Sequence, residues 1–211
     1  MITPPLICTK TFFENASKRN KISPKRRELL IQIAQKIAFQ YLKNNQLNLI
    51  FISTHNSRCS QLGQVWAFFA SEYFNLHTIH AFSGGTKATY FHRNTLKTLQ
   101  TAGFMFHLTD FSHQNPKYLI STKQTNKSIL AYSKGVQELT NKCPFITITT
   151  CNNSDKDTPF MSGAVYRFDL PITDPKFSDE TQKREAVYLK TNQQIAAELF
   201  FLFSELKQLI C

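Results

Sequence analysis

Residues 48–61, which read NLIFISTHNSRCSQ, indicate the architecture of this chain more clearly than any other segment. The first part of this stretch is an apolar run that stops at a small polar loop, and a helical pattern starts again directly after the loop. A buried strand would bring the chain to a tight loop whose backbone N–H groups converge, and the next helix would add its positive N-terminal end at the same point. This order predicts an anion-binding loop at residues 53–60.

The chain around this loop alternates short apolar runs with helical patterns, which is typical of βαβ units and a mainly parallel sheet. The pattern at residues 116–133 is compatible with either a loop or a hairpin insertion. Ligands of such sheets bind at the carboxyl ends of the strands, where the loop at 53–60 would lie. We expect strands at 47–52, 77–82, 144–150 and 166–170, and helices at 61–74, 93–102 and 182–209.

A further helix is predicted before the first strand. Ser23 and Pro24 suit a helix N-cap and a first-turn proline, and apolar residues recur at three- and four-residue steps through about Leu42. Residues 1–20 have few periodic apolar positions. The predicted fold is therefore α/β, a mainly parallel four-stranded sheet flanked by helices, with an N-terminal extension at 1–44 that carries the extra helix and an α/β domain at 45–211.

Composition limits the class of protein. The 211 residues, 42% of them hydrophobic, can bury one sizeable core. No apolar run approaches the ~20 residues that span a bilayer, and the start of the chain lacks a signal-peptide pattern, so we expect a cytoplasmic protein without a membrane partner. The five cysteines are widely spaced, with no C-x2-C pair, so neither a structural disulfide framework nor a metal site is expected, and no cofactor is implied.

The net charge of +11 would suit a polyanionic partner. Lysines are scattered through every segment, however, and the densest basic cluster, residues 18–27, lies at the start of the predicted N-terminal helix. No nucleic-acid-binding motif accompanies the charge. We therefore expect no nucleic-acid partner, and only a general attraction for phosphorylated substrates.

The loop resembles the C-x5-R-[ST] phosphate-binding loop of low-molecular-weight protein tyrosine phosphatases and thioredoxin-coupled arsenate reductases. Three later segments are similar to the same superfamily, in the same order. They are SGG at 83–85, close to the family's Ser-Ala-Gly; CNNSDKDTP at 151–159, close to its redox segment C-S-D-A-D-x-x-C-P; and Asp174-Pro175, close to its general-acid Asp-Pro. The resemblance runs from about Leu47 to the C-terminal helix and implies a phosphate-like anion or phosphorylated substrate as ligand, with a thioredoxin-type reductant as a possible partner.

Two chemical residues of the family loop are replaced. Ser53 stands where the family keeps its nucleophilic cysteine, and Cys59 stands where it keeps the arginine that grips the oxyanion. A cysteine there attacks as a thiolate, whereas a serine hydroxyl is far less easily ionised at neutral pH. Cys59 supplies neither the charge nor the planar fork of arginine. The first interpretation is therefore an oxyanion-binding protein with little or no standard activity.

The resemblance assigns the other loop positions to anion binding: Thr54, His55, Asn56, Ser57, Arg58 and Ser60. Asn56 tolerates a left-handed backbone, and Ser60 matches the hydroxyl that bonds to the nucleophile. His55 replaces the usual glycine and is expected to face solvent. Neighbouring residues at a loop-to-helix junction point in different directions, so the sequence leaves open whether Arg58 takes over the role of the missing arginine.

Outside the loop, the resemblance gives Asp174 the role of general acid, against the alternative of an ordinary turn aspartate before proline. Cys151 matches the first relay cysteine, but Thr158 replaces the second, so the full disulfide cascade is not expected. A second function stays open. A thiol at a helix N-terminus ionises readily, so Cys59 with Cys151 could serve an active phosphatase or a thiol-redox enzyme.

Overall fold

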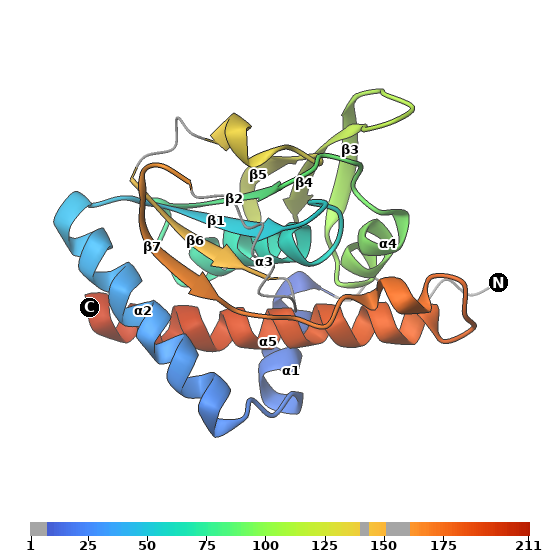
Figure 1. Cartoon of the computed structure of the whole chain (residues 1–211). Helices are drawn as coiled ribbons and strands as arrows, with labels where there is room; N and C mark the ends of the chain where they lie inside the picture. The colour runs from blue at the N-terminus through green and yellow to red at the C-terminus, as the bar shows by residue number, and fades with distance from the viewer. Residues whose placement is uncertain (1–7, 140–143, 151–160) are drawn as a thin grey trace.

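The main sheet confirms the predicted α/β class. The computed structural model describes residues 8–139, 144–150 and 161–211. Within them, four strands form a sheet in the order β2-β1-β6-β7, and each neighbouring pair is parallel (Figure 1). The strands are β1 (Leu47–Ser53), β2 (Ile79–Gly85), β6 (Phe145–Thr149) and β7 (Ala164–Asp169).

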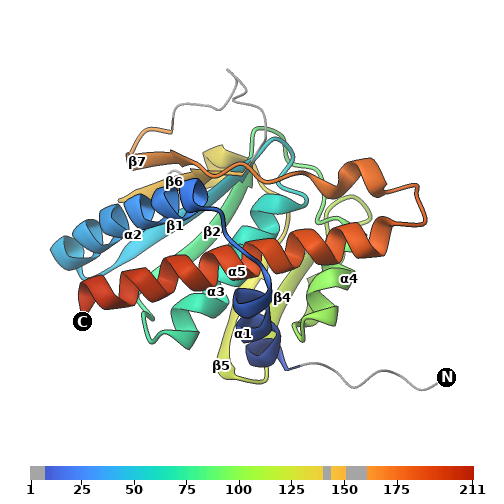
Figure 2. The same ribbon diagram turned by 90° about the horizontal axis from the view of Figure 1, so that it is seen from below.

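Side chains of β1 alternate between two apolar layers. Leu49 and Phe51 belong to the main core, which the helices supply, whereas Ile50 and Ile52 pack in a smaller cluster on the opposite face. The α-helices are α1 (Thr9–Arg19), α2 (Pro24–Asn44), α3 (Cys59–Tyr73), α4 (Arg93–Thr101) and α5 (Arg184–Ile210), and the short 3-10 helices are η1 (Val136–Leu139) and η2 (Pro175–Ser178). Figures 1 and 2 show α2, α3 and α5 on one side of the sheet. Because both faces of β1 are covered, residues 49–52 form a continuous apolar run.

A second, antiparallel sheet follows α4 in the chain. It has the order β3-β4-β5 and consists of β3 (Met105–Asp110), β4 (Lys117–Thr122) and β5 (Thr125–Ala131). The segment 116–133 is therefore a hairpin and not a loop. Strand β3 was not among the expected elements.

The N-terminal part of the chain contains two helices where one was predicted. α2 starts as expected, with the Ser23 hydroxyl accepting a hydrogen bond from the Arg26 N–H at 3.4 Å. Residues 1–20, for which no helix was predicted, contain α1. Its buried Phe13 stacks on Trp66 of α3, with ring centroids 5.3 Å apart and an interplanar angle of 7°. The first helix is thus packed into the main core.

None of the helices in the described ranges has both the length and the apolar character needed to cross a bilayer.

Candidate functional site

The loop 53–60 joins the end of β1 to the start of α3, as the sequence predicts. The neighbouring strand β2 ends beside it at Gly85. A Cβ atom at Gly85 would lie 2.7 Å from the Asn56 nitrogen and 2.9 Å from the Thr54 oxygen. Only glycine therefore allows the two backbones to approach so closely, which explains the last residue of the SGG segment.

Three side chains close the base of the loop. The hydroxyl oxygens of Ser53 and Ser60 are 2.7 Å apart. The Asn56 N–H donates to Ser53 Oγ at 3.1 Å, and the Asn56 side-chain amide donates to Ser60 Oγ at 3.0 Å. The structure thus brings together the nucleophile position and the two residues expected to support it.

Asn56 fixes the conformation of the loop. It is fully buried, and its backbone is left-handed with φ 45°. Its side-chain oxygen accepts hydrogen bonds from the Lys134 N–H at 2.9 Å and the Gln61 amide at 3.1 Å. Lys134 and Gln61 were missed by sequence reasoning. Nothing local to residue 134 indicates a contact with a loop 78 positions earlier.

The carbonyl oxygens of Thr54, Asn56 and Ser57 point out of the loop and accept hydrogen bonds from the residues that surround it. Their donors are the Lys87 N–H (2.9 Å) and Thr86 hydroxyl (3.0 Å) for Thr54, the Gln61 amide (3.1 Å) for Asn56, and the His92 N–H (3.1 Å) for Ser57. Three peptide units are therefore held in a defined orientation.

The N–H groups of the same three peptide units belong to His55, Ser57 and Arg58. In a planar trans peptide the N–H points opposite to the C=O, so these groups are directed away from the scaffold. Within the described residues they have no hydrogen-bond acceptor. The start of α3 adds its own N-terminal end, since its N-cap residue makes no side-chain cap. The loop therefore presents donors without acceptors, an arrangement suited to an anion.

Cys59 occupies the first position of α3, but its side chain belongs to the main hydrophobic core and is 5% exposed. A thiol acting as nucleophile or redox group needs access to its substrate. The structure therefore gives the relocated-thiol alternative little support. Cys151 and Thr158 lie outside the described residues.

The Arg58 side chain is paired with residues that follow β7 in the chain. Its Nη2 donates to Asp179 Oδ2 at 2.5 Å, and its Nε donates to the Tyr188 hydroxyl at 2.7 Å. Asp174 lies nearby, with Oδ1 3.9 Å from Arg58 Nε, and the same oxygen caps η2 by accepting from the Lys176 N–H at 2.9 Å. The carboxyl of Asp174 thus lies next to the end of the loop while it also serves as a turn residue.

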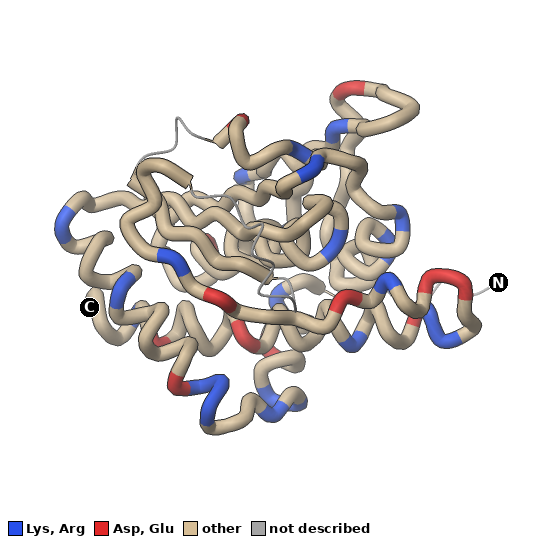
Figure 3. The backbone as a smooth tube through the Cα atoms, in the orientation of Figure 1, with Lys and Arg blue, Asp and Glu red and all other residues tan. Residues whose placement is uncertain are grey.

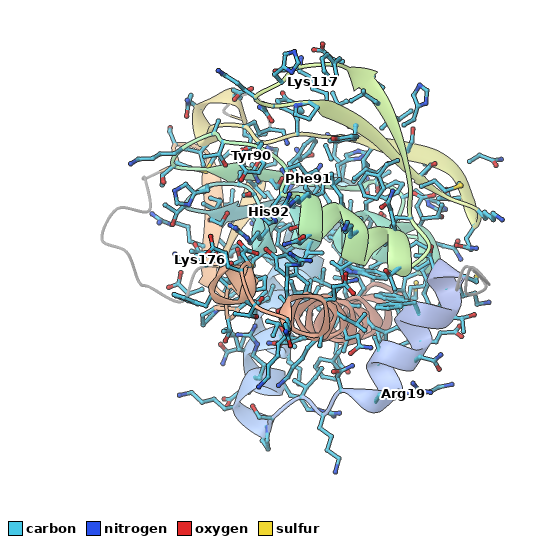
Figure 4. All side chains as sticks on the ribbon, turned by 90° about the vertical axis from the view of Figure 1, so that its right-hand side faces the viewer. Arg19, Tyr90, Phe91, His92, Lys117 and Lys176 are labelled. Carbon is cyan, nitrogen blue, oxygen red and sulfur yellow. The ribbon has the colours of Figure 1, made fainter. Side chains whose placement is uncertain are left out.

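Asp179 is the centre of a polar network that sequence reasoning missed. Besides Arg58, it accepts hydrogen bonds from Tyr188 at 2.6 Å and from Asn94 at 3.2 Å, and His92 Nε2 lies 3.6 Å away. Figure 4 shows His92 at the start of α4 with Lys176 of η2 on the neighbouring segment. The network connects the start of α3, the start of α4, the end of η2 and α5.

This network predicts a component of acid sensitivity. Burial alone would raise the pKa of Asp179, but hydrogen bonds from Tyr188 and Arg58 outweigh it and the pKa is lowered. A carboxyl with a lowered folded-state pKa contributes stability above its unfolded pKa, and this stability is lost as the pH falls through the folded pKa. We expect Asp179→Asn to cost about 1–3 kcal/mol at pH 7 and less below about pH 4, where the parent loses the same interaction.

Urea unfolding of parent and variant from pH 7 to pH 3 measures this difference. Asp169→Asn, at an exposed position of β7, is the matched control and should show no such convergence. A pH-independent gap between parent and Asp179→Asn would contradict the assignment.

No metal centre is found among the described residues, since no three His, Cys, Asp or Glu side chains lie together as a metal site requires.

No family model matches the chain, and no curated protein matches it in sequence. Solved structures do match: an arsenate reductase in the phosphate-binding state has a TM-score of 0.52 at 13% identity, over 76% of this chain and 99% of that one. A low-molecular-weight phosphotyrosine phosphatase from Vibrio cholerae O395 has a TM-score of 0.51 at 12% identity, over 75% of this chain and 95% of that one. The chain has the fold of the low-molecular-weight phosphatases and arsenate reductases.

Proposed function

We propose that this protein binds phosphate-type oxyanions in the loop 53–60 and lacks the standard chemistry of the enzymes that share its fold. The observation that carries the proposal is the orientation of the loop peptides. Their carbonyls bond to the scaffold, so the amides of His55, Ser57 and Arg58 are available to a ligand. Most of the cradle is backbone, and it therefore does not depend on the two replaced side chains.

Catalysis is expected to be lost because no described group activates Ser53. Its hydroxyl contacts the Ser60 hydroxyl and the Asn56 N–H, and neither is a base. A serine nucleophile needs an adjacent general base within hydrogen-bond reach. Arg58 does not replace the missing oxyanion clamp, because Asp179 and Tyr188 hold its guanidinium.

The ligand class follows from the donors. Amide N–H groups and a helix N-terminus favour small tetrahedral anions, either inorganic phosphate or the phosphoryl group of a phosphorylated substrate. The arsenate reductase with the same fold was solved in a phosphate-binding state, which agrees with this class. We infer a binding or regulatory role, in which the loop retains a phosphorylated group without cleaving it.

The proposal is tested by titrating inorganic phosphate while recording backbone amide chemical shifts. We expect saturable shifts at His55, Ser57 and Arg58 with a Kd of about 1 mM or weaker, about −4 kcal/mol. The affinity should be modest because a bidentate arginine, with hydrogen bonds worth about 1.5–3 kcal/mol each, is absent.

A matched pair of variants localises the effect. Asn56→Gly keeps a residue that tolerates the left-handed backbone but removes the side-chain hydrogen bonds with Ser60, Lys134 and Gln61, so binding should weaken at least about tenfold. Asn75→Gly makes the same change at an exposed residue with φ 56° and should leave binding unchanged. Unmoved amides over residues 54–60 up to about 50 mM phosphate would contradict the proposal.

A further inference from the structure

A groove lies between α5 and the junction of α1 with α2. Its volume is about 570 Å3, and its walls include residues 19–23, Arg26, Pro171 and the α5 segment 190–198. Figure 1 shows the end of α1 and the start of α2 at the lower edge of the molecule, below α5, whereas the loop 53–60 lies at the ends of the sheet strands. The groove is therefore separate from the candidate site.

The groove carries an excess of positive charge. Four cationic residues line it, Arg19, Lys21, Arg26 and Lys190, against the single carboxylate of Glu198. Figure 3 shows Lys and Arg gathered at the end of α1 and the start of α2. The basic cluster of residues 18–27, which the loop chemistry leaves unused, thus forms much of one hollow.

Glu198 neutralises only one of these cations. Arg26 donates to both of its carboxylate oxygens, at 3.0 and 2.7 Å, and the Gln194 amide donates to one of them at 3.1 Å. Glu198 is 4% exposed, so this two-bond pair of Arg26 and Glu198 is a fixed part of the groove wall. Over residues 8–139, 144–150 and 161–211, no carboxylate lies within ion-pair distance of Arg19, Lys21 or Lys190.

We propose that this groove binds a small anion that carries at least two phosphate groups. Arg19, Lys21 and Lys190 come from α1, the connection after it and α5, so one ligand in the hollow can contact cations from all three segments. Its volume lies in the range of about 300–1,000 Å3 that small-molecule sites occupy. Ile22, Pro171 and Ala197 give it an apolar side, as such sites also require.

A small ligand is favoured over a nucleic acid by the shape of the site. The three cations without an acid partner surround a hollow between two helices and a short connection. A strand of nucleic acid instead needs a basic surface that follows its backbone, often with aromatic side chains for the bases. No aromatic residue lines this groove in the described part of the chain.

Inorganic pyrophosphate is the probe for the test, added to the full chain while amide shifts and heats of binding are recorded. We expect saturable shifts over residues 19–26 and 190–198. Lys21→Ala combined with Lys190→Ala should weaken this binding at least about tenfold, since each lost charged hydrogen bond is worth about that factor or more. Lys43→Ala, at the exposed far end of α2, is the control and should bind as the parent does.

The outcomes separate the groove from the loop. Asn56→Gly should weaken phosphate binding at residues 54–60 and leave the pyrophosphate-induced shifts in the groove unchanged. The proposal for the groove and the proposal for the loop can therefore be contradicted independently of each other. Unmoved groove amides at about 10 mM pyrophosphate, or equal losses in Lys43→Ala, would overturn the proposal. It would also be overturned if single-stranded oligonucleotides bound the same residues with an affinity that rose with their length, which would indicate a nucleic-acid surface.

Discussion

The double variant Ser53→Cys with Cys59→Arg is expected to hydrolyse p-nitrophenyl phosphate at least about 1,000-fold faster than the parent, whose turnover should be negligible. The first change supplies a thiol whose pKa the amides and the start of α3 would lower. The second supplies the fork for the oxyanion. Ser60, Asn56 and Asp174 already lie where they could serve both groups.

Each single change should recover little activity, because nucleophile and oxyanion clamp act as a unit and their effects are strongly non-additive. Adding Asp174→Asn to the double variant tests the general acid and should lower the rate by about 100-fold or more. Arsenate reduction should stay poor even in the double variant, since Thr158 leaves the relay one thiol short.

Two results would contradict this expectation. Substantial parent activity that disappears in Cys59→Ser would establish Cys59 as a relocated nucleophile, despite its 5% exposure. A folded but inactive double variant would show that an arginine at position 59 cannot leave the core to face the loop, and that the scaffold itself has diverged.

Truncating Phe13 to alanine is expected to lower the free energy of unfolding by about 3–5 kcal/mol. Phe13 is fully buried, and its ring centroid lies 5.3 Å from both Trp66 and Phe69 of α3 and 5.0 Å from Phe200 of α5. Its removal would leave a cavity at the point where α1 meets two other helices, and close packing does not readily refill such a space.

Urea unfolding measures the loss, with Phe39→Ala as control. Phe39 lies on α2 and is 58% exposed, so its truncation should cost no more than about 0.5 kcal/mol. A loss below about 1 kcal/mol for Phe13→Ala would mean that α1 is a dispensable attachment and not part of the core.

The fold was largely predictable because the two central strands of the main sheet, β1 and β6, are buried on both faces. Ile50 and Ile52 face one cluster and Leu49 and Phe51 the other, which produces the continuous apolar run from which the parallel sheet was predicted. Similarly, Ser23 and Pro24 gave the start of α2 from local chemistry alone.

The elements that were missed lack such a signal. The buried face of α1 has helical spacing, but it includes Thr9 and Ala16, which contribute little apolar character. Strand β3 is mostly exposed, so its sequence shows no core-facing alternation.

In the candidate site too, contacts between residues close in sequence were predictable, whereas contacts between distant residues were not. Ser53, Asn56 and Ser60 lie within eight residues, and their association followed from the loop pattern. The contact of Asn56 with Lys134 spans 78 residues, and those of Arg58 with Asp179 and Tyr188 span 121 and 130. Pairings of this length depend on the tertiary fold, and no local pattern indicates them.

A crystal structure of the protein grown with inorganic phosphate tests anion binding in the loop 53–60 directly. We expect an intact phosphate ion in the loop, accepting hydrogen bonds from the amides of His55, Ser57 and Arg58, with no covalent bond to Ser53. A loop without phosphate, with the carbonyls of Thr54, Asn56 and Ser57 turned inward, would contradict anion binding in this loop.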